Sequence, residues 1–96
     1  MQFTGSRWSW ERSVILIHVP SAPGVYALWR DETCLYVGET QDLLSRLVLH
    51  YQVVNQAFAG EQPTWFWFEA CPGIDRTARR KALILRLRPS VNSVVS

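Results

Sequence analysis

GVYALWRDETCLYVG, residues 24–38, predicts a β-hairpin. Val25–Arg30 and Cys34–Gly38 are rich in the β-branched and aromatic residues that favour strands. The polar residues Asp31-Glu32-Thr33 between them are typical of a turn. The hairpin therefore opens with Gly24-Val25-Tyr26 and closes with Tyr36-Val37-Gly38.

The two tyrosines of these tripeptides have the same parity along the hairpin. If the strands pair residues whose numbers sum to about 62, Tyr26 and Tyr36 face each other directly. A shift of one residue would place them on opposite faces of the sheet. Gly24 and Gly38 would let a ligand or a neighbouring backbone approach the phenols. Tyrosines in strands are most often packing residues, so by themselves these two favour a structural role.

A helix is predicted to follow the hairpin, over about Leu43–Ala57. Thr40 or Asp42 can cap its first turn. Arg46 and His50 lie four residues apart and therefore share one face, which in most helices is a solvent-exposed face. The apolar positions that we expect to face the core include Leu43, Leu47 and Val54.

Further elements are predicted on either side of this unit. Val14–Val19 favours a strand, with a short helix rising from Ser9 as the alternative. Thr64–Ala70 is a strand with large side chains on both faces, which is typical of a central or doubly covered strand. A second helix runs from Asp75, its natural N-cap, to about Leu87, and Pro89 ends it.

These elements give the order β-β-α-β-α, with an extra element possible at the N-terminus. Ninety-six residues fit one domain, residues 1–96. The 48% apolar and 19% charged content is typical of a globular protein. We therefore expect an α+β domain in two layers, a central antiparallel sheet with flanking helices.

The basic residues are unevenly distributed. The net charge is only +2, and nine of the ten cationic residues are arginines. From Arg76 to Arg88 there are six cations and no acid, namely Arg76, Arg79, Arg80, Lys81, Arg86 and Arg88. Because arginine binds phosphate in a forked, bidentate manner, this stretch suits a polyanionic partner, although a solvated helix face is an equal alternative.

The cysteines and tryptophans have mainly structural interpretations. Cys34 and Cys71 show no metal-binding spacing, which favours reduced thiols and a cytoplasmic protein. No stretch resembles a signal peptide or a membrane span. Trp65 and Trp67 alternate with Phe66 and Phe68, and core packing is favoured over stacking on bases for all four. Tryptophans that remain exposed would instead mark a homodimer or partner surface.

The motifs together resemble the GIY-YIG nuclease superfamily, which includes homing endonucleases, some restriction enzymes and the nuclease domain of the bacterial nucleotide-excision endonuclease. Gly24-Val25-Tyr26 matches the first motif and Tyr36-Val37-Gly38 the second. The segment 39–43 resembles the polar link into the family's helix. Arg46 and His50 stand where the family has its catalytic arginine and often a histidine, and Leu83-Ile84, Pro89 and Asn92 are similar to its closing motif. The resemblance spans about residues 20–92.

This resemblance implies an endonuclease that hydrolyses phosphodiester bonds in nucleic acid, with DNA as the first expectation. Tyr26 would accept a proton from the attacking water or orient it, provided that a cation lowers its pKa. Arg46 would supply that charge and stabilise the phosphate, and Tyr36 would bind a phosphate oxygen. His50 would protonate the leaving oxygen or contact phosphate. Asn92 would hold the C-terminal segment near the site, and a glutamate on the second helix would hold Mg²⁺ or Mn²⁺.

The sequence departs from the family at that glutamate. The matching position, three residues before Leu83, is Arg80, which cannot bind a divalent cation and would repel one. Glu69 is a weak candidate for a replacement ligand, and Asp75 and Glu39 are weaker ones. Arg80 could itself bind a phosphate without metal. The alternative function is therefore a degenerate domain that binds nucleic acid or a protein partner without cleavage.

Overall fold

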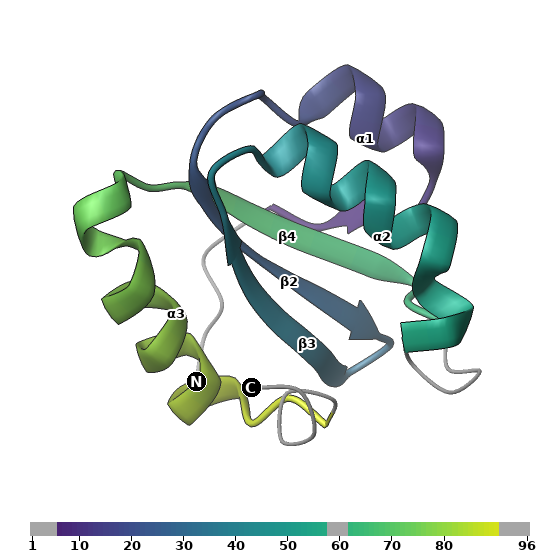
Figure 1. The fold of residues 1–96 in the computed structure, drawn as a ribbon. Coiled ribbons are helices and arrows are strands. Elements are labelled where there is room, and N and C mark those ends of the chain that lie inside the picture. Colours follow the sequence, from purple (N-terminus) through teal and green to yellow (C-terminus); the bar gives the residue numbers. More distant parts are fainter. Residues whose placement is uncertain (1–5, 58–61, 91–96) are drawn as a thin grey trace.

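The fold is an antiparallel sheet with helices on both faces (Figure 1). The structure is a computed structural model that describes residues 6–57 and 62–90. Within them the four strands lie in the order β1-β4-β2-β3, so the predicted interior position of the strand at Trp65–Ala70 is confirmed. The strands are β1 (Trp8–Ser9), β2 (Gly24–Arg30), β3 (Thr33–Thr40) and β4 (Trp65–Ala70). The helices are α1 (Arg12–His18), α2 (Leu43–Ala57) and α3 (Gly73–Leu87).

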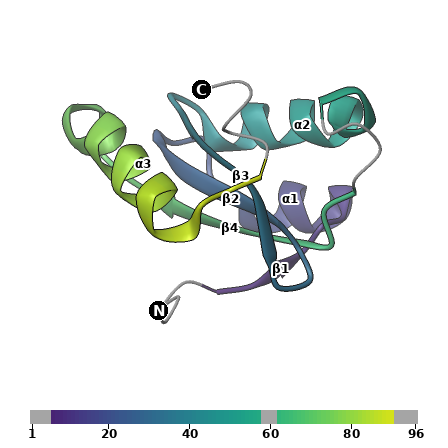
Figure 2. The same ribbon diagram turned by 90° about the horizontal axis from the view of Figure 1, so that it is seen from below.

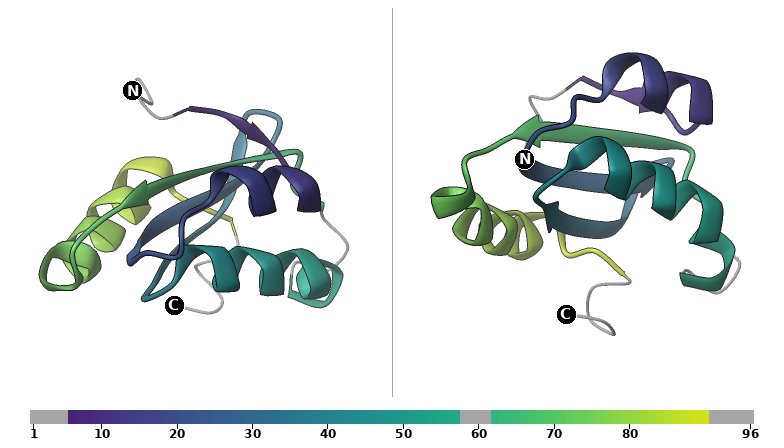
Figure 3. Two further views of the ribbon diagram at one scale, coloured as in Figure 1. Left: turned by 90° about the horizontal axis from the view of Figure 1, so that it is seen from above. Right: turned by 45° about the horizontal axis from the view of Figure 1, so that its top comes forward.

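The sheet is covered by helices on two sides, which makes three layers (Figure 2, Figure 3). Tyr26 and Leu28 of β2 pack in one core with α1 and α2, whereas Val25 and Ala27 pack in a second core with Leu83 of α3. The predicted α+β class is confirmed, but the expectation of two layers was wrong. Both faces of β2 are apolar, so each must be buried by a packed helix.

The segment predicted first as a strand, Val14–Val19, is largely helical, as the alternative interpretation had it. Ile15 and Val19 are buried four residues apart, so one helix face suffices to anchor the segment, while Leu16 and Ile17 are exposed. The added N-terminal strand β1 pairs with β4 through Trp8 and Phe66. No helix within the described residues is long and apolar enough to cross a lipid bilayer.

The β2–β3 hairpin contains a β-bulge that the sequence did not predict. Its turn has two residues, because Arg30 pairs with Thr33 and Asp31 adopts a left-handed φ of 53°. The register then shifts by one residue between Leu28 and Trp29, where β3 carries an additional residue. As a result Leu28 pairs with Tyr36.

The register of the tyrosines therefore differs from the expected one. Tyr26 lies opposite Gly38, and the paired numbers sum to 64 rather than about 62 (26 + 38). Tyr26 and Tyr36 are diagonal neighbours on the same face, with ring centroids 6.0 Å apart. Without the bulge, a two-residue turn would have paired Tyr26 with Val37 and turned Tyr36 to the opposite face.

Gly38 leaves room for the ring of Tyr26. A Cβ at this position would lie 2.5 Å from both Cζ and the hydroxyl oxygen of Tyr26 and 2.8 Å from a ring carbon of Tyr36. A Cβ on Gly24, two residues before Tyr26 on β2, would clash with the carbonyl of Glu69 and with Leu43. The glycines thus permit close packing inside the domain.

Helix α2 is fixed at its first turn by side-chain and backbone bonds. Asp42 accepts a hydrogen bond from the backbone N–H of Ser45 at 3.2 Å, which makes Asp42 the N-cap. Thr40 accepts one from the N–H of Asp42 at 3.0 Å. The N–H of Leu43 bonds to the carbonyl of Ala22 at 2.9 Å, so the proline-rich connection 20–23 positions the helix. Leu43 and Leu47 are buried as predicted, and the side chain of Val54 lies outside the described residues.

Helix α3 begins three residues earlier than expected, since its N-cap is Pro72 and not Asp75. Pro72 is its N-cap residue, and Asp75 lies in the first turn, where its charge complements the helix dipole. The prediction that Asp75 caps the helix was therefore wrong. The end at Leu87 is confirmed: Arg88 adopts a left-handed φ of 49° and Pro89 follows.

The aromatic strand β4 divides its side chains between the two cores, as the alternation predicted. Trp65 and Trp67 belong to the core beneath α3, and Phe66 and Phe68 to the core beneath α1 and α2. Core packing is therefore confirmed for all four. Cys34 and Cys71 are free thiols, and burial raises the pKa of Cys34 to about 12.

We predict that Gly38→Ala destabilises the domain by about 1–3 kcal/mol, because the new methyl group overlaps the buried ring of Tyr26. Chemical denaturation measures the change. Gly73→Ala is the matched control, since its Cβ would meet only Arg76 at an ordinary 3.6 Å. Equal stabilities for the two variants would contradict this account of Gly38.

Candidate active site

Three aromatic rings from three elements meet beside α2. The hydroxyl of Tyr26 on β2 is hydrogen-bonded to Nε2 of His50 on α2 at 2.7 Å. The ring centroids of Tyr26 and His50 are 5.4 Å apart, and those of Tyr36 and His50 are also 5.4 Å apart. The structure thus brings together Tyr26, Tyr36 and His50, which the sequence separates by up to 24 positions.

The depth of Tyr26 determines its protonation state. Tyr26 is only 1% exposed. Burial raises the pKa of Tyr26 above its usual value, and Tyr36 adds to the rise, while the charges of Arg46 and Arg80 oppose it. The sequence argument required a cation that brings the phenol toward ionisation. Two cations are present, but burial outweighs them, so Tyr26 is protonated at neutral pH.

His50 is neutral in this environment. Burial lowers the pKa of His50 to about 4, and the charge of Arg46 contributes to the decrease. At neutral pH the imidazole can take part in hydrogen bonds, but the imidazolium that would protonate a leaving group is not populated. The site therefore holds a protonated phenol next to a neutral imidazole.

Arg46 lies one helical turn before His50 and is exposed. It lines an open groove of about 490 Å³ between the start of α2, the end of β3 and the first turns of α3. The residues along the groove are Glu39, Thr40, Gln41, Asp42, Ser45, Arg46, Leu49 and Arg76. This groove is large enough for a phosphate group and part of its sugar.

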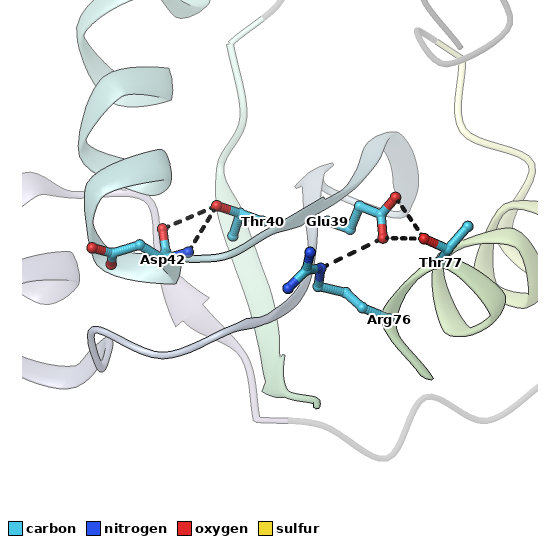
Figure 4. A network of polar contacts seen from close by, with 5 residues as sticks. All are labelled: Glu39, Thr40, Asp42, Arg76 and Thr77. Carbon is cyan, nitrogen blue, oxygen red and sulfur yellow. Dashed lines mark hydrogen bonds and ion pairs between the residues drawn. The ribbon is translucent and has the colours of Figure 1, made fainter. Parts of the chain in front are cut away.

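A polar network joins β3 to α3 at the rim of this groove (Figure 4). The carboxylate of Glu39 accepts hydrogen bonds from the hydroxyl of Thr77 at 3.0 and 3.2 Å. It also pairs with Nε of Arg76 at 3.6 Å. Glu39 therefore attaches α3 to the edge strand, immediately after Gly38.

The predicted basic residues of α3 have different environments. Arg76 is paired with Glu39, and Arg79 is paired with Glu69 at 2.8 Å. Arg80 is half-buried and Lys81 is exposed. Asn92, the last of the predicted nucleic-acid-binding residues, lies outside the described residues.

The structure shows no cluster of metal-ligating side chains among the residues that it describes. Among residues 6–57 and 62–90, no three His, Cys, Asp or Glu side chains lie close enough to hold an ion. Glu69, the replacement ligand considered from sequence, is paired with Arg79. It also lies opposite Val25 in the sheet, on the face away from Tyr26. Oxygen ligands are what Mg²⁺ and Mn²⁺ require, and the nearby position on α3 is occupied by Arg80.

Sequence reasoning missed the roles of Thr77 and Ser45. Thr77 bonds to Glu39, and Ser45 bonds through its hydroxyl to Asp42 at 3.0 Å. The only sequence signal was the position of Ser45 three residues after a capping aspartate. Nothing in the sequence indicated that Thr77 would meet Glu39, because the contact spans 38 positions.

Comparisons with known proteins identify the fold. No protein-family model matches the sequence, and no curated protein matches it. Among solved structures, the magnesium-bound GIY-YIG N-terminal endonuclease domain of UvrC from Thermotoga maritima superimposes with a TM-score of 0.72. The two are 23% identical over 83% of this chain and 92% of that one. A point mutant of the same domain, bound to its catalytic divalent cation, gives a TM-score of 0.72 at 22% identity. The GIY-YIG fold predicted from the sequence is therefore confirmed.

We predict that His50 makes the domain less stable in mild acid. The unfolded chain takes up a proton near pH 6.5, whereas folded His50 does so only near pH 4. Between these values the contribution of His50 to the free energy of unfolding falls with decreasing pH, by at most roughly 1.4 kcal/mol per pH unit. Denaturation of the wild type and of His50→Gln across this pH window measures the free energy of unfolding of each. The difference between the two should become smaller as the pH falls.

His18→Gln is the control, because it replaces the other described histidine, which is exposed on α1. A pH dependence that is identical in the wild type and in His50→Gln would contradict the burial of a neutral His50.

Proposed function

We propose that this GIY-YIG-fold domain acts on the phosphodiester bonds of nucleic acid, with Tyr26, Tyr36, Arg46 and His50 as its active site. The observation that supports this most is the 2.7 Å hydrogen bond between Tyr26 and His50, with Tyr36 in contact with both rings. The fold is that of an endonuclease domain, so a nuclease-type function is the most economical interpretation.

The protonation states of Tyr26 and His50 and the charge of Arg46 indicate a separate role for each residue. Tyr26 stays protonated, so it acts by orienting the attacking water, not as a free phenolate. Its partner His50 is neutral and holds the phenol in place through their hydrogen bond. Arg46 lies in the open groove and binds the phosphate oxygens, whose negative charge grows in the transition state. Tyr36 donates a further hydrogen bond to phosphate.

The divalent cation has no place in this proposal. The UvrC domain binds a catalytic divalent cation, magnesium in one form, whereas no group of three His, Cys, Asp or Glu side chains among the described residues of this chain could hold one. No step is therefore assigned to a metal ion. DNA is the proposed substrate, in the cytoplasm.

A second candidate function is binding without cleavage. Arg80 at the position of the family's metal ligand, and the absence of an acidic cluster among residues 6–57 and 62–90, favour it. In this case the same groove would hold a phosphodiester that is not hydrolysed. Binding that weakens steeply with salt, without any cleaved product, would support this candidate over the first.

We predict that the purified protein nicks supercoiled plasmid. Arg46→Ala should lower the rate of nicking at least about a hundredfold, because the phosphate loses its contact with the guanidinium group. Tyr26→Phe should have an effect of similar size, because the hydroxyl that contacts the water is removed. Relaxation is measured on gels in Mg²⁺, in Mn²⁺ and in a chelator.

Arg12→Gln is the control for net charge, since Arg12 is exposed at the start of α1. Nicking that persists unchanged in Arg46→Ala would come from a contaminant or from another site, and the proposed active site would be wrong.

A further inference from the structure

Two arginines on different helices lack a counter-ion. Among residues 6–57 and 62–90, no carboxylate pairs with Arg46 on α2 or with Arg80 on α3. The arginines that flank Arg80 along α3 are neutralised, Arg76 by Glu39 at 3.6 Å and Arg79 by Glu69 at 2.8 Å. The nearby carboxylates of Glu39 and Glu69 therefore pair with the flanking arginines and not with Arg80.

The burial of Arg80 distinguishes it from the other unpaired cations. Arg80 is half-buried, whereas Lys81, Arg86 and Arg88 on the same segment are exposed. Removing a cation from water without an opposite charge is unfavourable. An anionic ligand would offset this cost at Arg80, whereas the exposed cations are already solvated.

Arg46 and Arg80 lie on the two helices that border one groove. Arg46 lines this groove together with Arg76, and Arg80 follows Arg76 by one turn of α3. In agreement with this placement, the charges of both arginines counteract the rise in the pKa of Tyr26. Tyr26 in turn lies opposite Gly38, where a Cβ would meet the rings of Tyr26 and Tyr36. The network of Glu39, Arg76 and Thr77 fixes α3 against this edge one helical turn before Arg80 (Figure 4).

We propose that Arg46 and Arg80 together bind one phosphodiester group of a nucleic acid beside Tyr26, and that the guanidinium of Arg80 takes the place of a divalent cation there. This inference rests on the proposed function for its ligand. Two forked guanidinium groups can hold the four oxygens of one phosphate with several charge-assisted bonds. A metal ion would be repelled by both, and the described residues supply no carboxylate cluster to retain it.

The test is binding of a fluorescent DNA duplex, followed by anisotropy over a range of salt concentrations in a chelator and in MgCl₂. We expect the wild type to bind equally well in both, apart from the ionic-strength effect that a matched amount of NaCl reproduces. Arg80→Gln should weaken binding at least about tenfold and lower the slope of log affinity against log salt by about one. Arg12→Gln removes the same charge from α1 and should change affinity much less.

Two further variants separate the chemistry from folding. Arg80→Lys keeps the charge but loses the fork, and its affinity should lie between those of the wild type and Arg80→Gln. Arg80→Glu should bind the duplex better in MgCl₂ than in the chelator, because a carboxylate can hold the ion. Circular dichroism of each variant shows whether it is folded.

The outcomes distinguish this inference from the proposed function. If the wild type does not bind the duplex, the proposed function fails and this inference with it. If the wild type binds but requires Mg²⁺, or if Arg80→Gln matches Arg12→Gln, this inference alone is overturned.

Discussion

The β-bulge in the hairpin is the constraint on which the site depends. A two-residue turn at Asp31 would by itself turn Tyr26 and Tyr36 to opposite faces of the sheet. The additional residue on β3, opposite the step from Leu28 to Trp29, restores them to one face. His50 of α2 can then contact both rings. The contacts of Tyr36 with Tyr26 and His50 follow from that shift of one residue.

The site is also part of the core, which limits how it can work. Tyr26 belongs to the same buried cluster as Leu28 and Phe66, and Gly38 has no side chain because the ring of Tyr26 fills that space. The burial that orders the phenol also raises its pKa and lowers that of His50. Stability and proton chemistry are therefore coupled at these residues, and a substitution at either one alters both.

The charges of α3 show a division between structural and available arginines. Glu39 and Glu69 neutralise Arg76 and Arg79 and so hold α3 against the sheet. Arg80, between these attachments and the buried Leu83, pairs with no carboxylate in the part of the chain that the structure describes. The family resemblance implies a glutamate, with the opposite charge, at the position of Arg80.

The local sequence was sufficient to predict the β-β-α-β-α order and helix α2 with Asp42 as a candidate cap. It also predicted the shared parity of Tyr26 and Tyr36. These features are local, because strand and helix propensity, turn chemistry and side-chain alternation act over a few residues. It also indicated that Arg46 and His50 share a helix face. Only the tertiary structure decided that Val14–Val19 is mainly helix, that a bulge restores Tyr36 to the face of Tyr26, and that Glu39 meets Thr77. These features depend on which surfaces meet across the sheet, and contacts between residues distant in sequence form only when the whole chain packs.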